Sequence, residues 1–115
     1  MDTIYIVGGA AIDITGKPDS ICRERDSNLG RVGIRVGGVG HNIAKQLASL
    51  SYEVELVTAI GSGFHAGMVR ESCRKANVSL AHTYVGTEHT GTYIGVFDED
   101  GDMLVGISDM SVLEH

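Results

Sequence analysis

The stretch Gly37-Gly38-Val39-Gly40-His41-Asn42-Ile43-Ala44 joins two segments with different hydrophobic periodicities. On its amino-terminal side, residues 30–37 alternate between apolar side chains and arginine or glycine, which predicts a half-exposed strand with its apolar residues on one face. On its carboxyl-terminal side, apolar residues recur with helical spacing over residues 39–50. These residues are Ile43, Ala44, Leu47 and Ala48. We therefore expect a strand that enters an amphipathic helix through a glycine-rich turn.

The neighbouring segments also alternate between strand and helix. Residues 3–8 (Thr-Ile-Tyr-Ile-Val-Gly) predict a buried strand followed by a loop, and residues 53–60 predict another strand. Gly61-Ser62-Gly63 leads into a second helix. Its expected inner face consists of Met68, Val69, Ser72, Cys73 and Ala76. This order predicts an α/β fold with a parallel sheet and flanking helices.

The last third of the chain has a different pattern. Two strand-like segments, residues 90–97 and 103–107, flank Asp98-Glu99-Asp100-Gly101-Asp102. Acidic residues and glycine are typical of a turn between antiparallel strands. We expect a β-hairpin here, and no linker that would separate a second domain.

Composition excludes several classes of protein. The chain has 115 residues, a net charge of −6 and nine scattered basic residues, so it shows no patch for nucleic acid or an anionic membrane. It has neither a secretory signal nor an apolar run of roughly 20 residues, and we expect a soluble, cytoplasmic protein. Cys22 and Cys73 lack metal or disulfide spacing and are expected to be free thiols. His65, His82 and His89 show no ligand spacing, so no protein metal site is predicted.

The glycines do not match the common nucleotide loops. A dinucleotide fingerprint needs glycines where this chain has Ala10 and Ile12 or Asp13. A Walker A loop needs Gly-Lys-Ser/Thr, and Lys17 is followed by Pro18. Neither kind of phosphate-binding loop is expected.

The stretch from Gly37 to Gly61 resembles the amino-terminal signature of the PfkB (ribokinase-like) family of carbohydrate kinases. Gly37 and Gly38 are followed by the small residue Gly40, by Asn42 and, further on, by Ser51 and Gly61 at the family's spacing. Glycines let the backbone approach a hydroxyl-rich ligand, and the Asn42 carboxamide offers both a donor and an acceptor. The plain alternative is a glycine turn with an asparagine at the start of a helix.

The resemblance implies that Asp13 grips vicinal hydroxyl groups of the substrate. In the family, the first strand runs into a turn that ends in an aspartate, and residues 8–13 align with that segment. A carboxylate suits this role, because each oxygen can accept a charge-assisted hydrogen bond. The alternative is a simple loop residue. Many relatives carry asparagine two residues earlier, where this chain has Ala11, and one sugar contact is thereby absent.

Features outside the signature resemble family members that act on nucleosides. They include Asp26-Ser27-Asn28 and residues 103–110 (Met-Leu-Val-Gly-Ile-Ser-Asp-Met). The resemblance implies that residues 29–36 and 90–108 form a small antiparallel β lid over the sugar, and that two lids pair in a homodimer. Asn28, Ile107 and Asp109 would then border the substrate, although a loop or packing role suits each equally. His41, inside the glycine motif, is expected to contact the substrate.

The family's Gly-Ala-Gly-Asp segment, which supplies the catalytic base and the anion-binding helix start, does not occur in these residues. The resemblance therefore implies that residues 1–112 are the amino-terminal portion of a truncated kinase domain, without catalytic residues of its own. ATP and Mg²⁺ would serve the full-length enzyme and bind outside this portion. An exposed sheet edge would then also favour a homodimer. Residues 113–115 (Leu-Glu-His) are expected to be a tag remnant.

The expected activity is phosphorylation of a sugar hydroxyl. The expected substrate is pseudouridine or a related nucleoside, and a free sugar such as ribose or fructose is the alternative. A further alternative is a non-catalytic module that dimerises through the β lid, in which the glycine turn is only structural.

Overall fold

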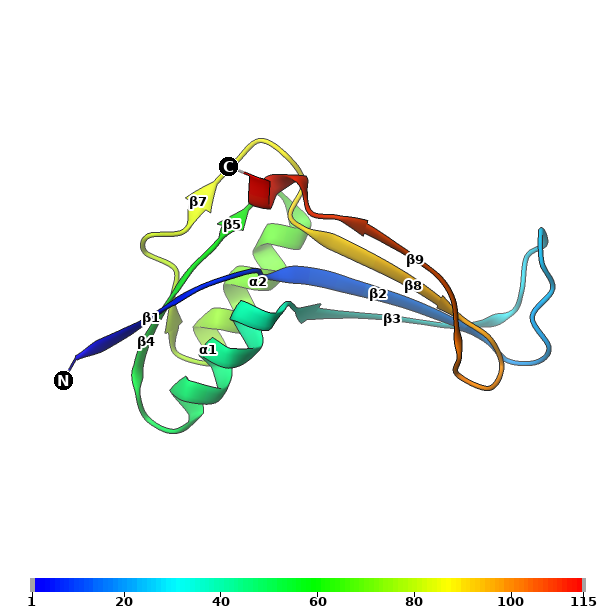
Figure 1. The fold of residues 1–115 in the computed structure, drawn as a ribbon, viewed down its shortest axis with the longest axis horizontal. Helices are drawn as coiled ribbons and strands as arrows, with labels where there is room; N and C mark the ends of the chain where they lie inside the picture. Colours follow the sequence, from blue (N-terminus) through cyan, green and yellow to red (C-terminus); the bar gives the residue numbers. More distant parts are fainter. Residues whose placement is uncertain (1, 115) are drawn as a thin grey trace.

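The computed structural model describes residues 2–114, which form two parts within an envelope of 53 × 32 × 19 Å (Figure 1). One part, the base, is a parallel sheet with two helices. The other is a four-stranded sheet that extends from the base as an arm, and we call it the lid sheet. Met1 and His115 lie outside the described residues.

The base confirms the predicted alternation of strands and helices. β1 (Thr3–Val7), β4 (Glu53–Val57) and β6 (Val78–Ser79) form a parallel sheet in the order β1-β4-β6. α1 (Val39–Ser49) connects the lid sheet to β4, and α2 (Phe64–Lys75) returns the chain to β6. Apolar residues of both helices and of the sheet form one buried core. Its members include Ala44, Val54, Leu56, Ile60, Val69, Cys73 and Val78.

Two expectations about burial in the base are wrong. β1 is not buried on both faces, because Tyr5 and Val7 point away from the helices and are 58% and 81% exposed. Ile43 of α1 is also exposed, whereas Ala44, Leu47 and Ala48 of the same predicted stripe lie in or against the core. Gly40 and His41 are buried with Ala44. The helix therefore presents its glycine-rich first turn to the interior.

The segment predicted as one strand over residues 53–60 is two strands. β4 ends at Val57, and β5 (Ala59–Ile60) pairs in parallel with β7 (Tyr84–Val85) in a separate small sheet. β6 and β7 are only two residues long, and such short strands leave no periodicity to detect.

The lid sheet has the order β3-β2-β8-β9. β3 (Gly30–Gly37) is confirmed, and β8 (Thr92–Phe97) and β9 (Met103–Asp109) confirm the hairpin. β2 (Ala11–Pro18) corrects the sequence analysis, which expected a loop after β1. This segment ends in Gly-Lys-Pro, which is typical of a turn, but pairing with β3 on one side and β8 on the other extends it into a strand.

The register of the lid sheet separates its side chains into two faces, because side chains alternate along a strand and directly paired residues share a face. We call one of these the apolar face. Its residues are Ile12, Ile14, Val32, Ile34, Val36, Ile94, Val96, Val105 and Ile107, with Thr92 and Asp109 at the base. The other we call the polar face. Its residues include Asp13, Thr15, Lys17, Arg31, Gly33, Arg35, Tyr93 and Ser108.

The chain ends in a short 3-10 helix, η1 (Ser111–Glu114), whose Val112 is fully buried. The expected tag remnant therefore falls partly within an ordered turn, at Leu113 and Glu114, and partly outside the described residues, at His115. No helix among residues 2–114 is both long enough and apolar enough to cross a membrane.

The two cysteines should react at different rates with an alkylating reagent. Burial raises the pKa of the Cys73 thiol from 9.0 to about 11, whereas Cys22 is partly exposed in the loop after β2. Because the thiolate is the reactive form, labelling at pH 8 followed by mass spectrometry should modify Cys22 first. The folded state favours the neutral thiol of Cys73, and this preference adds to the free energy of unfolding at pH values below about 9. That contribution should be lost as the pH rises from about 9 through about 11. Equal labelling rates in the folded chain would contradict this assignment.

Candidate functional site

The glycine motif forms a close crossing of two backbone segments. Gly8 and Gly9, at the end of β1, lie directly against Gly38 and Gly40, at the start of α1. A Cβ on Gly38 would lie 2.6 Å from the carbonyl oxygen of Gly9, and a Cβ on Gly40 would lie 2.7 Å from the carbonyl carbon of Gly8. The His41 amide donates a hydrogen bond of 3.0 Å to the Gly9 carbonyl. We call this contact the glycine crossing, and it leaves no room for side chains at positions 38 and 40.

Asp13 lies beside this crossing, on the polar face of the lid sheet. It is paired with Arg35 of β3, and its carboxylate extends along the sheet to cover Gly37. A Cβ on Gly37 would collide with that carboxylate. The structure therefore places Asp13 within a strand rather than at the end of a turn, and brings it into contact with the first glycine of the motif.

Asn42 follows in the first turn of α1, with its side chain on the exposed surface. Its Oδ1 lies 3.1 Å from Nδ1 of His41, so that Nδ1 donates and Oδ1 accepts. Within residues 2–114, one lone pair of Oδ1 and both Nδ2 hydrogens have no further protein partner.

His41 itself is 2% exposed. Its Nε2 lies 2.9 Å from Oγ of Ser72 on α2. With the Nδ1 hydrogen donated to Asn42, a neutral ring accepts a hydrogen bond from the Ser72 hydroxyl at Nε2. Protein groups therefore engage both ring nitrogens. The geometry gives His41 the role of tying α1 to α2 and orienting Asn42.

The remaining predicted residues lie apart from Asp13. Asn28 is in the loop between β2 and β3, at the end of these strands farthest from the base; Asp13 lies five residues, roughly 16 Å, from Pro18 at that end of β2 if each strand residue advances about 3.3 Å. Its carboxamide closes this loop through hydrogen bonds with Arg23 and Asp26. Asp109 is on the apolar face of the lid sheet and accepts hydrogen bonds from Ser111 at the start of η1.

A buried polar pair and a cavity near it were not anticipated from the sequence. Glu55 is a nearly buried carboxylate on β4, and it contacts both the backbone amide and Nδ1 of His82. Near this pair, a cavity of about 440 Å³ lies at the carboxyl ends of β1 and β4 and is lined in part by Gly8, Gly9 and His82. The sequence does contain a signal for this buried carboxylate, because Glu55 stands between the apolar residues Val54 and Leu56 of a predicted strand.

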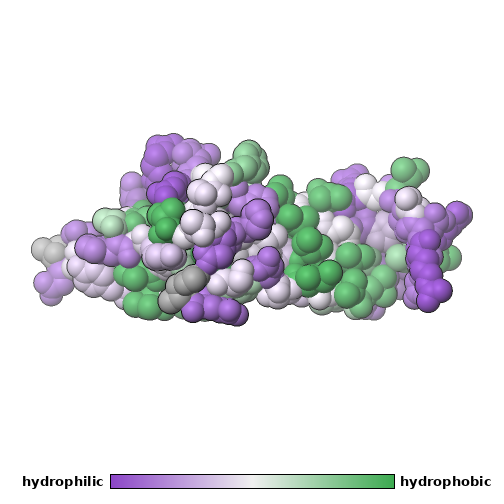
Figure 2. Space-filling model, turned by 90° about the horizontal axis from the view of Figure 1, so that it is seen from above, coloured by the Kyte–Doolittle hydropathy of each residue, from purple (hydrophilic) through white to green (hydrophobic). Residues whose placement is uncertain are grey.

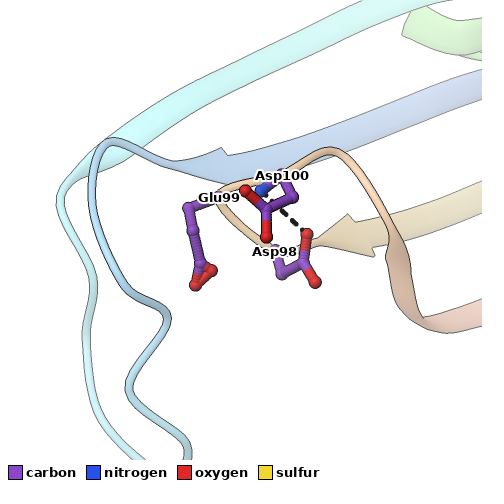
Figure 3. A group of neighbouring side chains, drawn as sticks. All are labelled: Asp98, Glu99 and Asp100. Carbon is purple, nitrogen blue, oxygen red and sulfur yellow. Dashed lines mark hydrogen bonds between the residues drawn. The ribbon is translucent and has the colours of Figure 1, made fainter.

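The acidic turn between β8 and β9 is built by its own side chains (Figure 3). The Asp98, Glu99 and Asp100 carboxylates lie near one another. Oδ1 of Asp98 accepts hydrogen bonds from the amides of Asp100 and Asp102, each 2.9 Å long, and Glu99 accepts one from the Cys22 amide. The Asp98 carboxylate therefore closes the turn, and the Glu99 carboxylate links the turn to the loop after β2.

Comparison with known proteins gives a consistent result. The model of the pfkB family of carbohydrate kinases matches residues 1–114. Pseudouridine kinase of Escherichia coli (strain K12) is 35% identical over 112 residues, which cover 96% of this chain and 36% of that protein. Guanosine-inosine kinase of Exiguobacterium acetylicum is 26% identical over 119 residues, which cover all of this chain and 39% of that protein. The chain thus spans somewhat more than a third of these two relatives.

Solved structures share the fold. A putative sugar kinase from Clostridium perfringens has a TM-score of 0.92 at 26% identity, over 99% of this chain and 36% of that one. A carbohydrate kinase from Agrobacterium tumefaciens has a TM-score of 0.89 at 28% identity, and the match covers 97% of this chain and 36% of that one. Ribokinase from Cryptococcus neoformans var. grubii serotype A, in complex with ADP, has a TM-score of 0.77 at 25% identity, and the match covers 95% of this chain and 34% of that one. The fold is therefore ribokinase-like, as the sequence predicts.

The glycine crossing gives a direct test of the site's architecture. Gly38 has φ +94°, and an alanine there would collide with Gly9, so Gly38→Ala should lower the free energy of unfolding by about 2 kcal/mol or more. Gly67→Ala is a matched control, because Gly67 is within α2 with open space around its Cβ position. That change should raise the free energy of unfolding by about 0.5–1 kcal/mol. Urea denaturation of both variants measures the difference, and equal effects would refute the crossing as a steric constraint.

Proposed function

The chain belongs to the PfkB family of carbohydrate kinases, and we propose that it is the substrate-binding, amino-terminal part of an ATP-dependent kinase that phosphorylates a hydroxyl group of pseudouridine or a related nucleoside. The 35% identity to Escherichia coli pseudouridine kinase over nearly the whole chain carries this proposal. The similarity to a guanosine-inosine kinase also favours a nucleoside. A free sugar such as ribose or fructose is the second candidate, since carbohydrate kinases share the fold.

Asp13 and Asn42 are the residues we propose to hold the sugar ring. The Asp13 carboxylate offers two acceptor oxygens to neighbouring hydroxyl groups, and the Asn42 amide offers donors. Gly37 and Gly38 lie between them along the chain; Gly37 is covered by the Asp13 carboxylate, and Gly38 is partly exposed and has no side chain to obstruct a ring held by that carboxylate. His41 supports this arrangement from inside the protein by its contact with Asn42.

Phosphoryl transfer needs a base near the attacking hydroxyl and donors for the charge that develops on the phosphate. The Gly-Ala-Gly-Asp segment that supplies both in the family does not occur among these 115 residues. We propose that ATP and Mg²⁺ bind elsewhere in a full-length enzyme, and that these residues alone do not transfer phosphate. The similar ribokinase in complex with ADP supports an adenine nucleotide as the donor. Dependence on ATP is consistent with action in the cytoplasm.

Titration of the 115-residue chain with pseudouridine, uridine and ribose tests the site. We expect pseudouridine to bind most tightly, with Asp13→Ala and Asn42→Ala each weakening its binding about tenfold or more, because each removes a hydrogen-bonding group to the sugar. Isothermal titration calorimetry measures the affinities. Lys45→Ala, an exposed change on the same helix as Asn42, is the control and should leave the affinity unchanged. Unaltered binding in both site variants would leave only a structural role for the glycine motif.

The apolar face of the lid sheet is the surface we propose for homodimerisation. Val32, Ile34, Ile94, Val105 and Ile107 on this face are 40–79% exposed. Figure 2 shows hydrophobic side chains grouped over the lid, next to a strongly polar tip. A four-stranded sheet with one uncovered β-branched face is suited to packing against a second such sheet, with a common core about 10 Å thick. A second copy of this chain presents the same surface, which a two-fold dimer requires.

Adjacent residues of β9 provide a matched test of this dimer. Ile107 points to the apolar face and Ser108 to the polar face. Ile107→Lys should convert the chain to a monomer at micromolar concentration, because it would place an unpaired charge in the interface, whereas Ser108→Lys should leave the dimer intact. Sedimentation equilibrium distinguishes the two states. A monomeric unmodified chain at the same concentration would refute the proposed interface.

A further inference from the structure

Three polar side chains form a chain of hydrogen bonds that leads from α2 to the proposed sugar site. Oγ of Ser72, on α2, lies 2.9 Å from Nε2 of His41, and Nδ1 of His41 lies 3.1 Å from Oδ1 of Asn42. Ser72 is half-buried, His41 is buried, and Asn42 is exposed. The sequence predicts Ser72 only as part of the inner face of its helix, yet the structure connects it to the site through His41.

This chain of hydrogen bonds has one direction. A carboxamide oxygen accepts hydrogen bonds and cannot donate them, so the hydrogen between His41 and Asn42 belongs to Nδ1 of the ring. Nε2 of a neutral ring then has no hydrogen and accepts one from the Ser72 hydroxyl. With Oδ1 turned toward His41, Asn42 presents its Nδ2 group to a ligand. Asn42 is therefore a donor in this site, whereas the carboxylate of Asp13 is an acceptor.

The hydroxyl of Ser72 is committed to this contact. A serine within a helix often donates its hydroxyl hydrogen to a carbonyl of the preceding turn. Among residues 2–114, however, the Ser72 hydroxyl has His41 as its partner on the other helix. His41 is 2% exposed, so water has little access to Nε2, and a buried ring nitrogen without a partner is unfavourable. Ser72 thus holds one end of the ring while the His41 amide binds Gly9 at the glycine crossing.

We propose that Ser72 is a positioning residue for the substrate. Through His41 it holds the Asn42 carboxamide, before any ligand binds, in the orientation that presents the Nδ2 donors. This inference rests on the proposed function, because the group that it positions is one of the two proposed to hold the sugar. An untethered asparagine on the surface samples several rotamers, and fixing one of them in advance reduces the entropy lost on binding.

The orientation of Asn42 also defines the chemical class of ligand that the site accepts. The ligand must offer an acceptor to Asn42 and a donor to Asp13. A diol meets both requirements, because each hydroxyl group can donate and accept. An ammonium group, which only donates, would find no acceptor in the Nδ2 group of Asn42.

Spectra of the ligand-free, 115-residue chain test the orientation of the hydrogen bonds. In ¹H–¹⁵N spectra of the histidine rings, His41 should carry its hydrogen on Nδ1, and this hydrogen should exchange slowly because the ring is buried. Ser72→Ala should shift the Nε2 signal and accelerate the exchange, and Ser72→Thr should restore both because it retains the hydroxyl. Ser62→Ala removes an exposed serine just before α2 and is the matched control, with no expected effect. A hydrogen on Nε2 of the unmodified chain would overturn the proposal.

Calorimetric titration with pseudouridine tests the positioning role. Ser72→Ala should weaken binding about fivefold, and Ser72→Thr should bind as the unmodified chain does. In an Asn42→Ala background, Ser72→Ala should cause no further loss, because Ser72 acts only through Asn42. Asn42→Asp keeps the acceptor for His41 and loses both donors, so it should bind no better than Asn42→Ala.

Three results of this titration would overturn the proposal. They are equal losses from Ser72→Ala with and without Asn42, a lower melting temperature in Ser72→Ala with unchanged affinity, and undiminished binding by Asn42→Asp. Failure of the proposed function is distinguishable from these results. An unmodified chain that binds neither pseudouridine nor ribose would contradict that function, whereas the ring spectra would still decide whether Ser72 and His41 hold Asn42 in this orientation.

Discussion

The glycine crossing is the constraint on which the rest of this structure depends. The end of β1 and the start of α1 approach so closely that backbone atoms of Gly8 and Gly9 occupy the space where side chains at positions 38 and 40 would lie. The hydrogen bond from the His41 amide to the Gly9 carbonyl holds the two segments together. Because β2 continues from Gly9 and β3 leads into Gly38, this contact joins the base to the lid sheet, together with the packing of Ile12, Ile14 and Val36 in and against the core of the base.

The same contact places the polar groups of the proposed sugar site. Asp13 lies four residues after Gly9, and Gly37 immediately precedes the crossing, so the Asp13 carboxylate reaches the glycine motif. Asn42 is four residues beyond Gly38 and its amide donates to the Gly38 carbonyl, which fixes it in the first turn of α1. His41 then uses both ring nitrogens inside the protein, and one of them orients Asn42. A buried histidine therefore serves the site by positioning a neighbour.

The lid sheet has different chemistry on its two faces. Its apolar face is buried at the base, where Ile12 joins the core, and is exposed further out, where Ile34, Ile94 and Ile107 lie in one row. Its polar face carries Asp13 near the base and the exposed side chains of Lys17 and Arg31 toward the tip. Because strand periodicity separates the two faces, the proposed dimer contact and the proposed sugar site lie on opposite sides of one sheet. The row of apolar side chains in the proposed dimer surface runs across all four strands, and Asp13 of the proposed sugar site is on β2, an inner strand of the sheet.

The sequence by itself determined the local features of this protein: the alternating strand β3, both helices, the acidic hairpin turn and the glycine motif between β3 and α1. Each follows from periodicity or turn chemistry within a few neighbouring residues, and together these patterns predict an α/β fold. The ribokinase-like fold was expected from the resemblance of the glycine motif to a family signature. Only the tertiary structure decided that residues 11–18 form a strand, since Gly16 and Pro18 indicate a turn until β3 and β8 provide partners. It also decided that His41 is interior, that Asn28 lies far from Asp13, and that Lys17 stands opposite Arg31. The physical reason is that strand pairing and burial depend on residues far apart in the chain, and no local pattern specifies which of them will meet.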